Sequence, residues 1–237
     1  YGFVGGEDGL HALSIQLGEG GDASRDADAA DPQNTFGGLM AYNQKRLEEF
    51  RRRPMFELLR DGTLADPVRR RVFVQAVQVW LDGSQALGLA RQACCVDPKY
   101  AAPFLQDMRD AAEARSADPE SSRGAPQERD PALECMTNWF TYQMFVLDNA
   151  EKAALQIASK CASAAYRNVA VALLSEYSSH AYDHVNHAII GADLLRHQSP
   201  RTYFRLRAIV GEAWDMLSAV SDRVVELTLQ DGRVSSS

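Results

Sequence analysis

The chain has 237 residues, a hydrophobic content of 46%, a charged content of 24% and a net charge of −7 at pH 7. These values allow a packed globular core, and the acidic balance without a Lys/Arg cluster argues against nucleic acid as a partner. No apolar run is long enough to span a membrane, and the first residues lack the basic start of a signal peptide. We therefore expect a cytoplasmic protein.

Residues 1–33 are rich in Gly, Ala and Asp and could bury little apolar surface. We predict a flexible acidic extension, in which "HALSIQL" is the one candidate strand. A single helical domain is expected over 34–237.

The starts of several helices are marked by an acidic or hydroxyl residue followed by proline. Such a side chain can accept a hydrogen bond from a free N–H of the first turn, and proline at the first helical position lacks an N–H that would go unpaired. The four pairs predict an all-α fold: Asp66-Pro67, Asp97-Pro98, Asp130-Pro131 and Ser199-Pro200.

Apolar residues then recur at spacings of three and four, as in amphipathic helices. The aromatic residues Trp80, Trp139, Phe140, Tyr142 and Phe145 fit a core better than a substrate pocket. The polar stretch 116–131 is expected to be a surface loop. We predict helices at 36–52, 55–60, 67–95, 98–116, 131–148, 150–164, 167–197 and 200–229.

Three of the five histidines lie within eight residues, at positions 180, 184 and 187. At about 100° per residue, His180, His184, His187 and Asp183 share one helical stripe about 100° wide with Glu176. An apolar arc, from Leu174 to Leu195, lies beside it. The histidines are therefore expected to adjoin the core.

Buried imidazoles and carboxylates are costly unless they are hydrogen-bonded or coordinated. Two histidines four residues apart can reach one ion, and the third extends the set by one turn. Iron, manganese or zinc would suit these ligands. The alternative is that the stripe is satisfied by hydrogen bonds to neighbouring side chains or water.

The four cysteines, at 94, 95, 135 and 161, are predicted to be reduced and mostly core-filling. A thiol–imidazole pair between Cys161 and His180 is a second hypothesis for the reactive chemistry of this chain.

Three features resemble the haem-oxygenase-like superfamily, in particular the non-haem diiron oxidases and oxygenases related to thiaminase II. They are "LEEFRRRPMFELLRDGTLADPVRRRVF", "FLQDMRDAAEARS" and the spacing of the three clustered histidines. The resemblance covers about 36–229. It implies a bundle of about seven or eight helices and, at the level of the family, a homodimer.

The resemblance also implies a set of iron ligands. His180 and His187 would be ligands, His184 or Asp183 would take the carboxylate position, and other helices would contribute Glu113 and Glu151. Asp148 is an alternative to Glu151. The family's earlier histidine has no counterpart in 105–125, so a mononuclear site, a diverged dinuclear site and a metal-free descendant all stay open.

The function implied is that of an iron-dependent oxidase or oxygenase that acts on a small molecule with O₂, in secondary metabolism. The alternative is a degenerate, metal-free member that serves as a ligand-binding or partner-binding module.

Overall fold

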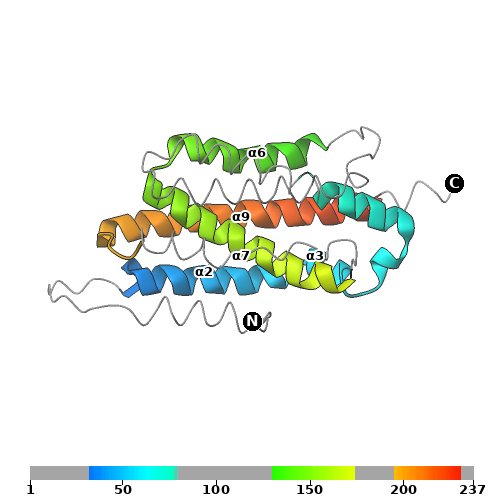
Figure 1. Ribbon diagram of the computed structural model, residues 1–237, viewed down its shortest axis with the longest axis horizontal. Helices are drawn as coiled ribbons and strands as arrows, with labels where there is room; N and C mark the ends of the chain where they lie inside the picture. The colour runs from blue at the N-terminus through cyan, green and yellow to red at the C-terminus, as the bar shows by residue number, and fades with distance from the viewer. Residues whose placement is uncertain (1–31, 78, 80–129, 174–194, 231–237) are drawn as a thin grey trace, which may run out of the picture.

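The computed structural model describes residues 32–77, 79, 130–173 and 195–230 (Figure 1). Within these ranges the regular structure is entirely helical, so the all-α prediction is confirmed. Six α-helical segments lie there, fewer than the seven or eight expected for the whole chain, and the predicted helix at 98–116 lies outside the described ranges. None of the described helices is long and apolar enough to cross a membrane. The elements are η1 (Pro32–Asn34), α2 (Phe36–Arg51), α3 (Pro54–Leu58), η2 (Thr63–Ala65), a helix at 67–77, α6 (Pro131–Val146), α7 (Asn149–Leu173) and α9 (Pro200–Gln230).

Three of the four predicted helix starts are confirmed by capping hydrogen bonds. The carboxylate of Asp66 accepts from the N–H of Val68 at 2.8 Å, and that of Asp130 accepts from Leu133 at 2.8 Å. The hydroxyl of Ser199 accepts from the N–H of Thr202, the third residue of α9, at 3.2 Å. The fourth pair, Asp97-Pro98, lies outside the described residues.

The first described residues are held against the start of α2. The hydroxyl of Thr35 accepts from the N–H of Gly38 at 3.1 Å and donates to the carbonyl of Pro32 at 2.8 Å. A Cβ on Gly38 would lie only 2.5 Å from that carbonyl oxygen, so η1 can sit here only because residue 38 is glycine. The expected extension, including "HALSIQL", otherwise lies outside the described residues.

Helix α7 corrects one predicted boundary. The sequence suggested a break between helices at 150–164 and 167–197, but the structure shows a continuous helix from Asn149 through Leu173. No Gly or Pro occurs near the expected break, and Ala165 and Tyr166 are both buried in the core. Continued apolar periodicity therefore carries the helix through the polar residues Arg167 and Asn168.

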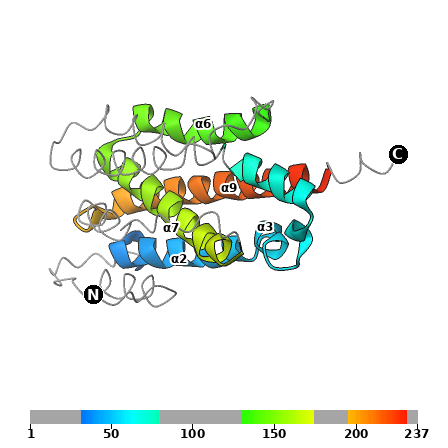
Figure 2. The ribbon, with the colours of Figure 1, turned by 45° about the vertical axis from the view of Figure 1, so that its right-hand side comes forward.

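Helix α9 is the central element of the described bundle. In Figure 1 and Figure 2 it lies in the middle, with α2 on one side, α6 on the other and α7 crossing it. Helices α2, α3, α6 and α7 all contact α9. Its Trp214 is fully buried, with its ring 5.4 Å from that of Phe50 between centroids, and Phe50 packs edge-on against Phe56 at 5.3 Å.

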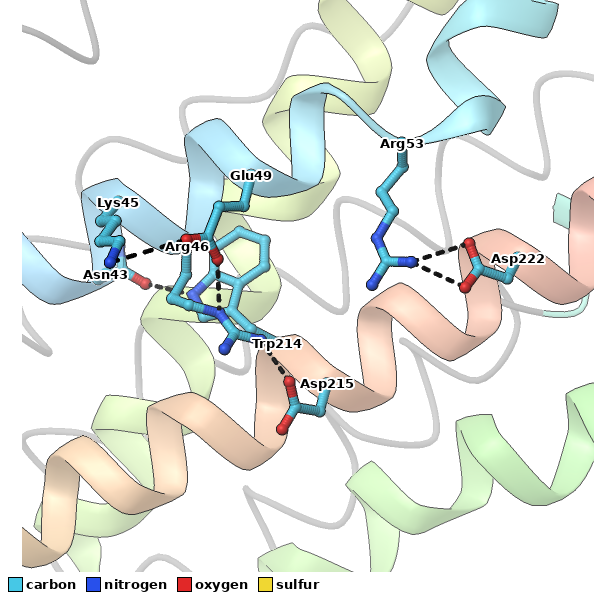
Figure 3. Close-up of polar contacts among 8 residues, drawn as sticks. All are labelled: Asn43, Lys45, Arg46, Glu49, Arg53, Trp214, Asp215 and Asp222. Atoms are coloured by element: carbon cyan, nitrogen blue, oxygen red, sulfur yellow. Dashed lines mark hydrogen bonds and ion pairs between the residues drawn. The ribbon is translucent and has the colours of Figure 1, made fainter.

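Ion pairs join α2, and the residue before α3, to two aspartates of α9 (Figure 3). Arg46 pairs with Asp215, and Nη1 of Arg53 lies 2.9 Å from Oδ2 of Asp222. The two aspartates are seven residues apart, which is two helical turns, so both lie on the same side of α9. Because the side chains of Asp215 and Asp222 are 73% and 45% exposed, these ion pairs are expected to add little stability.

Helix α6 lies at the edge of the bundle in both views (Figures 1 and 2). The prediction that its aromatic residues fill the core is correct for Phe140, which is 4% exposed, and wrong for Tyr142 and Phe145, which are 62% and 64% exposed. Tyr142 and Phe145 lie on the face opposite the buried Leu133 and Met144. Trp80 lies outside the described ranges.

Candidate functional site

Five of the six predicted metal ligands lie outside the described residues. These are Glu113 and the residues His180, Asp183, His184 and His187 of the histidine stripe. The sixth, Glu151, is on α7 and is described in full. In the part of the chain that the structure describes, no group of three or more His, Cys, Asp or Glu side chains is arranged to hold a metal ion.

Glu151 lies in the first turn of α7, and its side chain caps the start of this helix. Its Oε2 accepts a hydrogen bond from the N–H of Asp148 at 2.8 Å, and its own N–H donates to Oδ1 of Asp148 at 2.9 Å. This reciprocal pair is a capping box, in which two backbone N–H groups at the start of the helix each find an acceptor. The alternative ligand Asp148 is occupied by the same arrangement.

The second oxygen of Glu151 also has a partner. Its Oε1 forms an ion pair with Nε of Arg205 on α9. The glutamate side chain is 2% exposed and that of Arg205 is 68% exposed, so a buried carboxylate is paired with a largely exposed guanidinium. The pair links the start of α7 to the first turns of α9.

These partners make Glu151 a poor fit to a metal ion. A cation bound by this carboxylate would meet the positive charge of Arg205, which already balances the charge of Glu151. Its role as a ligand therefore stays a prediction, while its structural role is visible in the contacts.

The end of the histidine segment is anchored in the core. Leu195, which follows residues 174–194, is fully buried, and its carbonyl accepts a 2.6 Å hydrogen bond from the hydroxyl of Tyr203. The apolar arc predicted from the sequence included Leu195, and at this one described position it is confirmed. His197, two residues further on, is exposed.

A buried polar cluster that the sequence did not predict joins α2, α7 and α9. Oδ1 of Asn43 accepts from the indole N–H of Trp214 at 2.9 Å, and its Nδ2 lies 3.5 Å from Sγ of Cys161 (Figure 3 shows the first contact). Asn43 is 3% exposed. Its spacing of four residues from both Leu39 and Leu47 places it on the apolar stripe of α2, which was the available signal.

The environment of Cys161 argues against an activated thiol. Burial raises the pKa of this thiol, and the nearby Asn43 amide only partly offsets the effect. A nucleophilic cysteine requires a lowered pKa. The predicted pairing with His180 involves a residue that lies outside the described ranges.

Cys161 and Cys135 are both free thiols. Cys161 packs against the core, as predicted, but Cys135 is exposed on α6. Cys135 is therefore an exception to the expectation of mostly core-filling thiols. Cys94 and Cys95 lie outside the described residues.

Comparison with known proteins gives one match. No protein-family model and no solved structure matches the chain. An uncharacterized protein of Rickettsia prowazekii (strain Madrid E) is 24% identical over 197 residues, which cover 80% of this chain and 94% of the relative. The chain is thus similar, over most of its length, to a protein whose description gives no activity.

Proposed function

We propose that this chain is a non-haem iron-dependent oxidase or oxygenase with a haem-oxygenase-like helical bundle, acting on a small molecule. In this proposal His180 and His187 bind the metal, His184 or Asp183 completes the set on the same segment, and Glu113 contributes from a separate one. The bound metal would supply the activation of O₂.

The observation that carries the proposal is the burial of Leu195. Counting back from this residue at about 100° per residue, His184 falls within about 20° of it on a helical wheel, and His180 and His187 within about 60° to 80°. If the periodicity of the sequence is kept, the histidines lie on the side of a buried residue. Imidazoles in that position need a partner such as a metal ion.

The contacts of Glu151 sharpen the proposed ligand set. Because this carboxylate caps α7 and pairs with Arg205, the proposal does not depend on it. A site without Glu151 has fewer anionic ligands to balance two cations, which favours one metal ion over two.

The test is the retention of iron after anaerobic reconstitution with Fe(II) and desalting, measured by elemental analysis. We expect stoichiometric iron in the wild type and a loss of at least about tenfold in His180→Ala and His187→Ala, which corresponds to about 1.4 kcal/mol or more in binding. His197→Ala is the matched control, because it removes an exposed histidine just beyond the segment. Wild-type protein that retains no iron, or variants that retain as much as the wild type, would refute the proposal.

A second candidate is a metal-free module that binds a partner through its surface. The exposed apolar residues of α6 favour it, because Tyr142 and Phe145 are more than half exposed and a large exposed apolar patch commonly marks an interaction site. This candidate predicts no specific iron binding.

A further inference from the structure

One face of α7 is polar and yet buried over its first half. At about 100° per residue, five side chains with hydrogen-bond donors fall within about 100° on a helical wheel. We define them as the polar face of α7: Lys152, Gln156, Ser159, Lys160 and Ser163. Lys152 is 8% exposed and Gln156 is 5% exposed, while the other three are partly exposed. Buried polar groups are costly unless they are hydrogen-bonded, so a polar face in this position requires partners.

The polar face lies on the other side of α7 from the contacts with α2 and α9. Cys161 contacts Asn43 of α2, and Glu151 pairs with Arg205 of α9. On the helical wheel both residues of α7 lie more than about 100° from the centre of the polar face. The fully buried Ala154 and Ala158 lie on the same side as these contacts. The packing of α7 on α2 and α9 therefore does not account for the polar residues.

Gln156 lies at the centre of the polar face, about one helical turn from each of the two lysines. Its Nε2 atom is buried and has no hydrogen-bond partner among the described residues. Such a donor destabilises a fold, and in a native protein it commonly marks the place of a water, an ion or a ligand. Side chains at i and i+4 are neighbours on a helix, so Lys152 and Lys160 can both reach a group that accepts from Gln156.

The charge of α7 indicates that this group is an anion. The helix has one acidic residue, Glu151, which is already paired with Arg205, and three basic residues, Lys152, Lys160 and Arg167. The chain as a whole has the opposite balance, with a net charge of −7. An ammonium group has three donors, so each lysine can bind a ligand oxygen alongside a partner in the protein. The polar face thus offers two positive charges and an amide donor within about two helical turns.

We propose that the polar face of α7 binds a phosphate group. A phosphate monoester carries a charge of about −1.5 to −2 at pH 7 and has three strong acceptor oxygens, which matches two lysines and the amide of Gln156. Lysine is a common phosphate ligand because its ammonium group is a compact point charge. A carboxylate, with one charge and two oxygens, matches this set less well. The proposal concerns binding alone, so it does not depend on the proposed iron site.

The first test is equilibrium dialysis with inorganic phosphate from about 10 μM to about 10 mM, at an ionic strength held constant with chloride. We expect saturable binding in the wild type and a loss of affinity of at least about tenfold in Lys152→Met and Gln156→Leu, which remove a charge and a donor with little change in volume. The matched control is Lys45→Met, which should bind as the wild type does, because this lysine of α2 is 74% exposed.

Two further probes define the ligand chemistry. Acetate should bind at least about tenfold more weakly than phosphate, because it carries a single charge. Phenyl phosphate distinguishes the sources of the phosphate group. Tighter binding of phenyl phosphate than of inorganic phosphate identifies an organic phosphate as the ligand, and weaker binding identifies free phosphate.

The second test separates a binding role from a structural one. Without phosphate, Gln156→Leu should raise Tm by about 2–4 °C, because it removes a buried donor that has no partner among the described residues. This variant also carries the dialysis test if Lys152→Met fails to fold. A lower Tm would show that the amide has a structural role and would count against the proposal. A wild type that binds no phosphate, variants that bind it equally well, or acetate that binds as tightly would overturn the proposal, whether or not the chain binds iron.

Discussion

The contact between Asn43 and Trp214 allows a quantitative test of the buried polar cluster. Asn43→Leu keeps approximately the same volume, so the cavity contribution is small, but it removes the acceptor for the indole N–H at 2.9 Å. Trp214 is fully buried, and no water can replace the lost partner easily. The cost of an unsatisfied buried donor is about 1–3 kcal/mol. The contact between Nδ2 and the Cys161 sulfur adds little, because sulfur is a weak acceptor.

This cost should be visible in thermal and urea unfolding. For a chain of this size a loss of 1 kcal/mol lowers Tm by about 2–4 °C, so we expect a decrease of about 2–12 °C. The urea m-value should be unchanged, since the wild type and the variant expose the same amount of surface on unfolding. The loss is a considerable part of the about 5–15 kcal/mol that stabilises a typical protein.

A double-mutant cycle with Trp214→Phe separates the hydrogen bond from other effects. Phenylalanine has no N–H to satisfy, so Asn43→Leu should be nearly neutral in that background, with a coupling free energy of about 1–3 kcal/mol. If Asn43→Leu were equally destabilising in both backgrounds, or neutral in both, the cluster would not hold α2 to α9 in the way described.

Three further predictions concern other contacts. Gly38→Ala should destabilise the protein by about 1–3 kcal/mol in urea unfolding, because the new Cβ would meet backbone oxygens at 2.5 and 2.6 Å; Gly37→Ala, whose nearest atom is 3.9 Å away, should instead be stabilising by up to about 1 kcal/mol. The hydrogen bond from Arg223 lowers the pKa of Asp130 from its usual 3.8, so this carboxylate stabilises the fold well above that pH and loses its effect as pH falls through the lower folded-state value. The stability difference between wild type and Asp130→Asn should accordingly be present at pH 7 and vanish in acid, and a pH-independent difference would contradict this. Glu151→Gln keeps an oxygen that can accept from the Asp148 N–H but removes the charge paired with Arg205, so it should lower Tm by about 2–4 °C through loss of about 1 kcal/mol. Retained iron should be unchanged; a loss of iron would support this residue as a ligand.

Local signals in the sequence predicted the helix starts well. The caps at Asp66, Asp130 and Ser199 depend on residues within three positions of each other, and the energy of such a contact is set before any tertiary packing. The same kind of signal was present at Asp148 and Glu151, whose spacing of three residues is that of a capping box. Glu151 was predicted as a metal ligand without regard to this spacing, which is typical of a helix cap.

Features that depend on tertiary packing were harder to predict. The exposure of Tyr142 and Phe145 depends on which side of α6 faces α9, and a helix with apolar residues on every side gives no periodic signal of its orientation. Asn43 is buried because Trp214, far away in the sequence, provides its partner. The continuity of α7 past residue 165 depends likewise on the burial of Ala165 and Tyr166.

For the candidate site, the sequence supplies the residue types and the structure supplies two boundary conditions. Leu195 confirms one position of the predicted apolar arc, and the structure shows that Glu151 is engaged by Asp148 and Arg205. The histidine ligands themselves stay a prediction, because coordination depends on the relative positions of segments outside the described residues.

The central position of α9 has a consequence for the synthesis of this protein. Helix α9 is the last described element to leave the ribosome, yet α2, α3, α6 and α7 all pack on it. About 180 residues separate the end of α2 from the end of α9. At a synthesis rate of about 5–20 residues per second, α9 is completed roughly 10–35 s after α2. During that interval the nascent chain displays the apolar stripes that Trp214 and its neighbours will later cover. A chaperone that protects nascent hydrophobic segments is therefore expected to matter more for this chain than for a bundle whose helices pair in the order in which they are made.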